Sequence, residues 1–362
     1  MKVALVYDRV NKIGGAERVL ESLGELFPGL VLFTSVYNKK NTPWASKFKV
    51  KTSYLQNIPF LNSRHELIPY LMPFAFESFD FSGYDLVISV TSEASKGIVV
   101  PSPVPHICIC LTPTRYLWSG YKQYFKNPLL RFVTHPLVSY LRKWDLVAST
   151  RPDQFIAISQ TVAKRIKKYY KRESVVIYPP SDRLFRQKTE KKFMPFEKNY
   201  FLVVSRLVDY KRIDLAVKAC TKLKLPLVVI GEGNEYEKLD ALSGETIVFK
   251  GKVSDEELIA YYKNCRALIF PGEEDFGITM VEVQLAGKPV IAFKAGGALE
   301  IVKKGRTGVF FDKPTVASLC TVLKKFKDSR YNGMDCKINA KRFSEAVFKK
   351  AIKNFLRTKK YI

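Results

Sequence analysis

Residues 267–293 have the sequence ALIFPGEEDFGITMVEVQLAGKPVIAF, and this stretch decides the fold class. Its apolar run Ala267–Pro271 predicts a buried strand, Ile278–Ala286 predicts a helix, and Pro289–Phe293 predicts a second buried strand. Short, continuously apolar strands joined by a helix are typical of a parallel sheet covered by helices. The stretch therefore predicts a β-α-β unit of an α/β fold.

The same alternation extends through the rest of the chain. In the first half it predicts strands at Lys2–Tyr7, Val31–Val36, Asp85–Val90, His106–Leu111, Gln154–Ile158 and Ser174–Tyr178, and helices at Ala16–Phe27 and Thr161–Tyr170. In the second half it adds strands at Tyr200–Ser205, Leu227–Gly231, Ile247–Lys250 and Gly308–Phe311, and helices at Arg212–Lys222 and Asp255–Asn264. This pattern predicts two Rossmann-like domains.

The pair Pro179-Pro180 separates the two halves, because consecutive prolines stop both strand ladders and helices. We therefore expect an N-terminal domain over residues 1–180 and a C-terminal domain over residues 181–343. We expect the two domains to face each other across a cleft. A helix in residues 344–362 is expected to pack back on the N-terminal domain.

Length and composition exclude several classes of protein. The chain has 362 residues, of which 47% are hydrophobic and 26% charged, enough for two folded domains. Its six cysteines form no C-x-x-C pair, which argues against a zinc ribbon or a disulfide scaffold and indicates a reducing compartment. No uninterrupted apolar run reaches the roughly 18 residues that a membrane span requires. We therefore expect a cytoplasmic protein without a signal peptide.

The net charge of +26 arises from 60 Lys and Arg against 34 Asp and Glu. Such an excess indicates either a polyanionic partner or simply lysine-rich, solvated faces. A nucleic-acid partner is not expected, because the charge is spread over both halves and no helix-turn-helix, RRM or zinc motif is present. Two acid-free stretches, KRIKKYYKR at 164–172 and residues 121–144, instead predict a basic, aromatic patch that contacts an anionic membrane.

Two carboxylates follow the strand at 267–271. Glu274 lies on the predicted loop and Glu282 lies inside the predicted helix, eight positions later. Both can face one pocket while the helix-start amides of residues 276–278 point at an anion. Carboxylates suit sugar hydroxyls because they accept two hydrogen bonds from a diol. The simpler alternative is that these acidic residues only complement the dipole of the helix.

Two cations follow the strand at 200–205. Arg206 lies at its carboxyl edge and Lys211 at the predicted start of the next helix, so both could hold a diphosphate. A solvated basic turn is the alternative. After the first strand, the pair Gly14-Gly15 opens a helix, which favours either close approach of an anion or a plain strand-to-helix turn.

These motifs together resemble the retaining family 4 glycosyltransferases, which have the GT-B fold. The resemblance covers nearly the whole chain, and the segment from Glu274 to Glu282 followed by AGKPVIA is its most specific part. The segments LTPTRYLW at 111–118 and 154–180 are similar to bacterial mannosyltransferases that build O-antigen or other surface polysaccharides. The resemblance therefore implies a metal-independent hexosyltransferase that uses a nucleotide sugar and no further cofactor.

The resemblance also implies a role for each matching residue. Arg206 and Lys211 would hold the donor diphosphate, Glu274 would bind donor-sugar hydroxyls, and Glu282 would bind the ribose. The amides of Phe276, Gly277 and Ile278 would face the sugar and phosphate, Gly251 and Val253 the base, and Gly15 a phosphate. The acceptor would lie against Thr112, Arg115, Tyr116 and Trp118. Metal ligands are not expected, because the sequence has no D-x-D motif and its three histidines lack ligand spacing.

One position departs from the family pattern. Relatives commonly have His-Thr-Pro where this chain has Leu111-Thr112-Pro113, and leucine can neither transfer a proton nor donate a hydrogen bond. A front-face retaining mechanism tolerates this change, because the departing phosphate oxygen can take the acceptor proton.

The expected reaction is transfer of mannose from GDP-mannose to a saccharide or polyprenyl-diphosphate-linked acceptor, at the inner face of the cell membrane. Two other functions use the same nucleotide cleft. They are a sugar-nucleotide epimerase of GT-B fold and a non-catalytic, nucleotide-sugar-binding paralogue.

Overall fold

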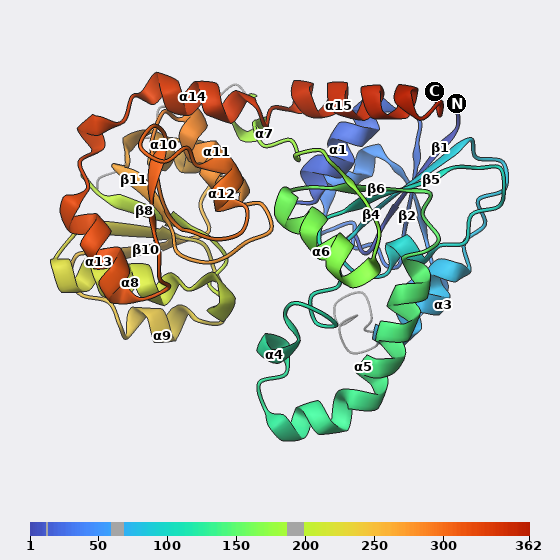
Figure 1. Cartoon of the computed structure of the whole chain (residues 1–362), viewed down its shortest axis with the longest axis horizontal. Coiled ribbons are helices and arrows are strands. Elements are labelled where there is room, and N and C mark those ends of the chain that lie inside the picture. Colours follow the sequence, from blue (N-terminus) through green and yellow to red (C-terminus); the bar gives the residue numbers. More distant parts are fainter. Residues whose placement is uncertain (12–13, 59–68, 187–198) are drawn as a thin grey trace. The chain divides into compact units, whose positions relative to one another are not determined.

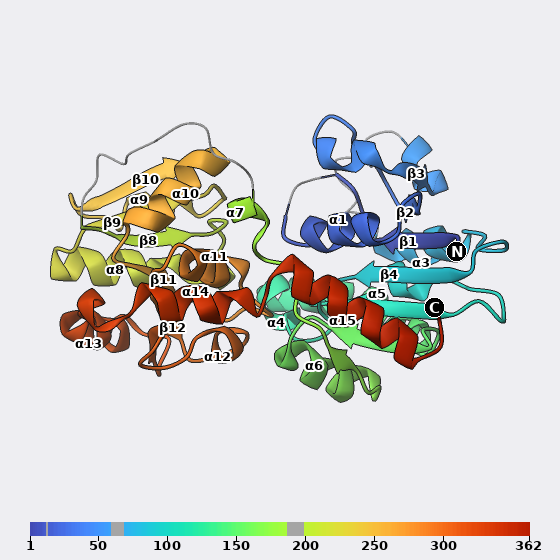
Figure 2. The ribbon, with the colours of Figure 1, turned by 90° about the horizontal axis from the view of Figure 1, so that it is seen from above.

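A computed structural model of the chain describes residues 1–11, 14–58, 69–186 and 199–362. These residues divide into two compact units. Unit 1 comprises Met1–Pro179 and Phe348–Ile362, and unit 2 comprises Pro180–Val347. Both termini of the chain belong to unit 1 and lie at the same end of it (Figures 1 and 2).

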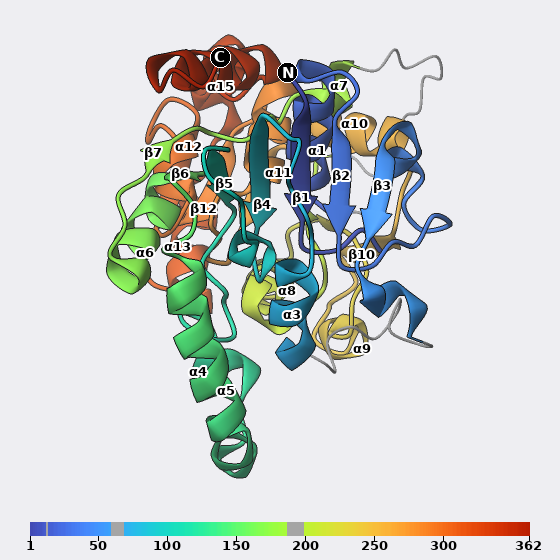
Figure 3. The same ribbon diagram turned by 90° about the vertical axis from the view of Figure 1, so that its right-hand side faces the viewer.

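Unit 1 is built on a parallel sheet with the strand order β3-β2-β1-β4-β5-β6-β7, and Figure 3 shows β1 to β5 side by side in this order. The strands are β1 (Val3–Tyr7), β2 (Val31–Thr34), β3 (Lys49–Thr52), β4 (Leu86–Thr91), β5 (His106–Cys110), β6 (Gln154–Ala157) and β7 (Val175–Val176). Every strand predicted in this half is confirmed, and the predicted and observed ends differ by fewer than three residues. The edge strand β3 was not predicted, because KVKT is lysine-rich and at most half-buried.

The helices of unit 1 are α1 (Glu17–Leu26), α3 (Met72–Glu77), α4 (Tyr121–Tyr124), α5 (Pro128–Ala148) and α6 (Gln160–Tyr170). The helix α5 begins with Asn127, whose side chain accepts the Leu129 N–H, and Pro128 occupies its first turn. It extends beyond the carboxyl ends of the strands, with α4 beside it (Figures 1 and 3). The sequence analysis predicted a basic, aromatic stretch here but no long helix.

Unit 2 is built on a second parallel sheet, with the order β10-β9-β8-β11-β12-β13. Its strands are β8 (Phe201–Val204), β9 (Leu227–Ile230), β10 (Ile247–Gly251), β11 (Ala267–Phe270), β12 (Val290–Phe293) and β13 (Gly308–Phe311). Numbered from the first strand of the unit, this is the order 3-2-1-4-5-6 of a doubly wound nucleotide-binding fold. Two Rossmann-like α/β domains, as predicted, are therefore confirmed.

Helices cover both faces of the second sheet (Figure 1). They are α7 (Arg183–Arg186), α8 (Ile213–Leu223), α9 (Tyr236–Asp240), α10 (Asp255–Asn264), α11 (Ile278–Leu285), α12 (Ala298–Ile301), α13 (Val316–Lys325) and α14 (Gly333–Lys341). Side chains of α8 and α13 pack with those of the sheet in one apolar core. The last helix, α15 (Glu345–Thr358), begins in unit 2, and from Phe348 onward it belongs to unit 1.

The strand order places a topological switch point between β8 and β11. These neighbours pair in parallel through Ala267 with Phe201 and Leu268 with Leu202. Their connections leave in opposite directions along the sheet, to β9 on one side and to β12 on the other. Ligands of open α/β sheets bind outside the carboxyl ends of the strands at such a point. We therefore expect a ligand-binding site at the loops after Val204 and Phe270.

The buried imidazole of His106 predicts a pH dependence of stability. Its Nε2 lies 2.8 Å from Ser89 Oγ, and burial, together with the charges of Arg151 and Arg172, lowers the His106 pKa to about 3. Histidine in an unfolded chain titrates near 6.5. Between pH 6.5 and 3 the unfolded chain therefore binds a proton that the folded chain does not. The free energy of unfolding decreases as the pH is lowered from 6.5 to 3.

We expect urea unfolding to show this effect when the wild type is compared with the His106→Gln variant. The free energy of unfolding of the wild type, relative to that of the variant, should decrease by about 1.4 kcal/mol for each pH unit below about 6.5. Parallel pH profiles of the two proteins would contradict the prediction.

Candidate functional site

The structure brings together two residues that the sequence analysis assigned to the donor site. Lys211 follows β8 and Glu274 follows β11, and Lys211 Nζ forms an ion pair with Glu274 Oε1. Their side chains are only 13% and 20% exposed. Lys211 lies in a 3-10 turn, Asp209–Lys211, before α8 begins at Ile213, which corrects its predicted place in the helix. A partly buried cation and carboxylate therefore meet at the switch point of unit 2.

Close backbone packing holds the loop that carries Glu274. The Gly297 N–H donates a 2.8 Å hydrogen bond to the Glu274 carbonyl oxygen. A Cβ atom at Gly296 would lie 2.2 Å from the same oxygen, and a Cβ at Gly272 would lie 2.7 Å from the Lys211 carbonyl oxygen. Only glycine leaves room for these two backbone contacts. The glycines at 272 and 296 therefore let the loops pack closely enough to hold Lys211 and Glu274 together.

Arg206 lies two residues after the end of β8 and has an exposed side chain. Its Nη2 donates a 2.7 Å hydrogen bond to the hydroxyl of Tyr210, within the same loop as Lys211. The loop after β8 therefore presents two cations, one exposed and one partly buried.

The helix α11 starts directly after the Glu274 loop. Its N-cap, Gly277, has φ +100°, a conformation that side-chain-bearing residues rarely adopt, and its eight residues begin at Ile278. Phe276 is buried, and Gly277 is buried beside it. The start of α11, where the helix dipole is positive, therefore adjoins Glu274.

Glu282 has a different environment from Glu274. Its side chain is buried, and its Oε2 accepts a 2.9 Å hydrogen bond from the hydroxyl of Tyr262 on α10. Tyr262 was missed by the sequence analysis, since nothing in its local sequence connects it to a carboxylate twenty positions later. The two remaining donor-site predictions lie at and after the end of β10, where Gly251 is its last residue and Val253 follows, both half-buried.

The predicted acceptor residues lie in unit 1, on the loop after β5. Tyr116 lines a small pocket with Glu93, Ala94 and Thr114, and the other lining residues include Met72, Leu141 and Trp144. Thr112 is buried and Arg115 half-buried. Leu111, the position that departs from the family pattern, is half-buried, and its N–H donates to the Thr91 carbonyl oxygen at 2.8 Å.

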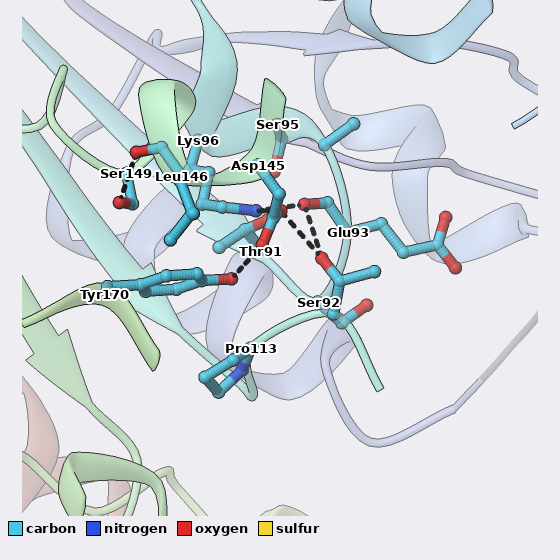
Figure 4. A network of polar contacts seen from close by, with 12 residues as sticks. Thr91, Ser92, Glu93, Ser95, Lys96, Pro113, Asp145, Leu146, Ser149 and Tyr170 are labelled. Carbon is cyan, nitrogen blue, oxygen red and sulfur yellow. Dashed lines mark hydrogen bonds and ion pairs between the residues drawn. The ribbon is translucent and has the colours of Figure 1, made fainter. Parts of the chain in front are cut away.

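A buried polar network lies behind this loop (Figure 4). Asp145 Oδ1 accepts a 2.5 Å hydrogen bond from Lys96 Nζ, and its Oδ2 accepts from Trp118 Nε1 at 2.7 Å and from the Tyr170 hydroxyl at 2.8 Å. Thr114 Oγ1 donates to Asp145 Oδ1 at 3.1 Å. Trp118 is therefore positioned by a carboxylate on α5. Sequence reasoning missed this network because Lys96 and Asp145 are 49 positions apart.

Charge in the network is balanced between an ammonium and a carboxylate. Burial by itself would lower the pKa of Lys96, but the adjacent Asp145 carboxylate outweighs burial and raises it. Burial, reinforced by Asp145, holds the pKa of Tyr170 well above its ordinary value, so the phenol stays protonated and can donate.

The switch point of unit 1 contains a carboxylate of the protein itself. Asp8 follows β1, and its two oxygens accept the backbone N–H groups of Ser92, Glu93, Ala94 and Ser95 at 2.6–3.0 Å. Later in the sequence, the predicted phosphate ligand Gly15 is exposed just before α1, which starts at Glu17, and the Gly14 N–H donates to Glu17 Oε2 at 2.8 Å. The loop after β4 therefore already binds an internal anion.

The described residues contain neither a cluster of metal ligands nor a helix that could span a membrane. In the part of the chain that the structure describes, no three His, Cys, Asp or Glu side chains are grouped to hold a metal ion. Metal independence stays a prediction. Over the same described ranges, no helix combines the length and apolar character needed to cross a bilayer.

Comparison with protein families gives a match over residues 185–343, to the family described as glycosyl transferases group 1. An uncharacterized glycosyltransferase of Methanocaldococcus jannaschii is 28% identical over 46% of this chain and 47% of its own length. A GDP-mannose-dependent alpha-mannosyltransferase of Mycolicibacterium smegmatis is 34% identical over 30% of this chain and 29% of its own. The O-antigen chain mannosyltransferase C of Escherichia coli is 25% identical over 46% of each chain.

The chain therefore spans about half the length, or less, of the curated relatives it matches. Among solved structures, Anabaena HepE in complex with UDP-glucose aligns with 99% of this chain and 100% of its own, at a TM-score of 0.72 and 19% identity. At that identity the likeness shows the fold, and it extends over both units. Residues 185–343 are thus similar to the group 1 glycosyltransferases, and the chain has the GT-B fold.

Proposed function

We propose that the chain is a retaining, metal-independent glycosyltransferase that moves mannose from GDP-mannose to a saccharide hydroxyl during synthesis of a surface polysaccharide. The observation that carries the proposal is the Lys211–Glu274 ion pair at the switch point of unit 2, with Arg206 on the same loop as Lys211. The switch point is where a doubly wound domain binds a nucleotide. Cations there suit a diphosphate, and the carboxylate suits sugar hydroxyls.

In the proposed mechanism, negative charge grows on the diphosphate as its bond to the anomeric carbon breaks. Lys211, Arg206 and the start of α11, through Phe276, Gly277 and Ile278, would stabilise this charge, since preorganised donors act where charge develops. Lys211 would then exchange part of its contact with Glu274 for the phosphate, which leaves Glu274 Oε1 able to accept from a sugar hydroxyl. The acceptor hydroxyl would attack the same face and pass its proton to the departing phosphate oxygen, so Leu111 needs no acid-base function.

The remaining donor contacts are proposed on the same basis. Glu282 would bind the ribose, and its hydrogen bond from Tyr262 would hold the carboxylate in one orientation. Gly251 and Val253 would lie against the base, and Gly15 would approach a phosphate. Thr112, Arg115, Tyr116 and Trp118 would shape the acceptor site.

Mannose as the sugar and GDP as the nucleotide are supported by similarity to relatives named for GDP-mannose and for O-antigen mannosyl transfer. One solved structure with the same fold, Anabaena HepE, contains UDP-glucose, so the base must be tested directly. The proposed acceptor is a polyprenyl-diphosphate-linked oligosaccharide, which would bring the enzyme to the inner face of the cell membrane as a peripheral protein.

A thermal-shift screen against GDP-mannose, GDP, UDP-glucose and UDP tests the donor assignment. Ligand at about 100 times its Kd stabilises the folded protein by about 2.7 kcal/mol, which corresponds to a rise of several degrees in the unfolding midpoint. We expect this rise with GDP-mannose and GDP, and its loss in Glu282→Gln. The matched control Glu237→Gln changes an exposed residue of α9 and should keep the rise.

A shift with uridine nucleotides alone would replace the proposed donor, and no shift with any nucleotide would contradict nucleotide-sugar binding. The anomeric configuration of the product, read by NMR, separates retention from inversion. Epimerised nucleotide sugar formed without an acceptor would indicate an epimerase instead.

A further inference from the structure

The helices α4 and α5 form a hairpin, residues 121–148, whose base packs on unit 1. Leu117, Val138 and Leu141 form a small apolar cluster there, against which Tyr121 and Phe125 pack. The guanidinium of Arg142 lies 4.6 Å from the Tyr121 ring centroid, and its Nε donates to the Leu117 carbonyl oxygen at 2.7 Å. The rest of the hairpin extends away from the sheet of unit 1 (Figures 1 and 3).

The tip of this hairpin, residues 124–133, exposes large apolar side chains. Phe132 is 79% exposed, Leu129 68% and Val133 67%, and two more are Tyr124 and Leu130. Four of these five lie within the five residues 129–133, a density that no other segment of the described chain reaches. Single exposed apolar residues are ordinary, but a contiguous cluster indicates a surface that is covered by a partner.

The charge around the tip identifies the kind of partner. Residues 121–144 contain no Asp or Glu, and Lys122 and Lys126 flank the apolar residues on α4 and on the connection to α5. Apolar side chains framed by cations match the interface of an anionic bilayer, where the side chains enter the acyl boundary and the cations meet the lipid phosphates.

The other basic stretch, residues 164–172, does not combine exposed apolar side chains with cations. On α6 the apolar residues Val162, Ile166 and Tyr170 are buried in unit 1, and the fully exposed residues are Gln160 and three lysines, with no large apolar side chain among them. Arg172 donates to the carbonyl oxygens of Ser149 and Pro152 and is a structural residue. The structure thus separates two patches that the sequence analysis treated as one.

The hairpin also leads to the pocket at Tyr116. Leu141, Trp144 and Asp145 of α5 line that pocket, and Leu141 is twelve positions after Leu129. At about 1.5 Å per residue, the tip and the pocket lie roughly 18 Å apart along one helix. One helix therefore joins the tip to residues that surround Tyr116, a predicted acceptor residue.

We propose that the hairpin tip is the membrane-contacting element of the protein and inserts into the interface of an anionic bilayer. The proposal rests on the proposed function in one respect, since a lipid-linked acceptor gives the enzyme its reason to bind a membrane. The binding itself requires neither donor nor acceptor, and can be tested without them.

Vesicle flotation at low salt tests the proposal. We expect the wild type to float with vesicles of phosphatidylglycerol and phosphatidylcholine, and to float far less with phosphatidylcholine alone. The double variant Leu129→Asp/Phe132→Asp should lower the bound fraction at least tenfold. The matched control Met334→Asp/Ile338→Asp changes two similarly exposed residues of α14 in unit 2 and should bind as the wild type does.

Charge reversals separate the two basic patches. Lys122→Glu/Lys126→Glu should weaken binding to anionic vesicles more than Lys164→Glu/Lys168→Glu on α6. Unchanged unfolding midpoints in all variants would show that they fold.

A fluorescence measurement reports insertion directly. All six native cysteines are buried, and burial raises the pKa of Cys108, Cys220 and Cys265 to about 12, so an introduced surface thiol can be labelled selectively. A polarity-sensitive dye on Phe132→Cys should shift to shorter emission wavelength when anionic vesicles are added, and the same dye on Ile338→Cys should not.

Three results would overturn the proposal. They are no flotation of the wild type, equal flotation of the Leu129→Asp/Phe132→Asp variant, or a wild-type dimer in sedimentation velocity that this variant dissociates without any vesicle binding. The last result would assign the tip to a second copy of the chain. Failure of the proposed function would show separately, as loss of the nucleotide-induced thermal shift in a protein that still floats.

Discussion

Replacing Lys211 by alanine is expected to lower kcat about 10²- to 10³-fold, because the variant lacks a cation aimed at the charge that develops on the leaving diphosphate. Lys211 is the partly buried cation of the site and forms an ion pair with Glu274, so its ammonium is already held where the proposed mechanism needs it. Initial rates with saturating donor and an oligosaccharide acceptor measure the effect. We expect the KM for the donor to change much less than kcat, since the interaction strengthens as the bond breaks.

Two further variants define the origin of that loss. Lys211→Arg keeps the charge and should recover part of the rate, although a planar guanidinium does not reproduce the geometry of an ammonium. Lys218→Ala removes an exposed lysine from α8 and should retain the wild-type rate. Wild-type turnover in Lys211→Ala would show that this residue does not bind the diphosphate.

Replacing Lys96 by methionine is expected to destabilise the folded protein by about 3–5 kcal/mol, because it leaves the buried Asp145 carboxylate without its counter-ion. Lys96 and Asp145 are each 1% exposed, so water cannot replace the lost partner. Three neutral donors, from Thr114, Trp118 and Tyr170, remain on the carboxylate but do not balance its charge. Calorimetry should show a fall in the unfolding midpoint on the order of 10 °C.

The double variant Lys96→Met/Asp145→Asn tests this explanation. An amide carries no charge and can still accept from Trp118 or Tyr170, so it should recover much of the loss. The exposed ion pair of Lys167 with Glu173 provides the control, and Lys167→Met should cost about 1 kcal/mol or less. A small effect of Lys96→Met, comparable with that of Lys167→Met, would contradict the importance of the buried pair.

Much of the fold could be predicted from local sequence pattern. The strand β13 and the helix α10 occupy the residues predicted for them, and β11, α11 and β12 lie within the stretch 267–293 as expected. These elements were predictable because their strands are continuously apolar and because α10 begins at an ordinary capping residue. Ser254, for example, forms a capping box with Glu257 at the start of α10.

The elements that were missed lack these local signals. The strand β3 has alternating lysines and at most half-buried residues, so its sequence resembles a surface loop. The helix α5 keeps most of its apolar residues exposed and contains Pro136, which disfavours a helix prediction. Both depend on neighbouring elements more than on their own sequence.

For the candidate site, the sequence by itself determined which residues lie at the ends of strands. Arg206 and Glu274 were found because each follows a short apolar run, and parallel strands end at the same edge of a sheet. Only the tertiary structure decided the partners of these residues. Lys211 meets Glu274, Tyr262 bonds to Glu282, and Lys96 neutralises Asp145 across separations of 20 to 63 positions. The physical reason is that secondary structure follows from interactions between near neighbours, whereas these contacts form only when packing of the core brings distant loops together.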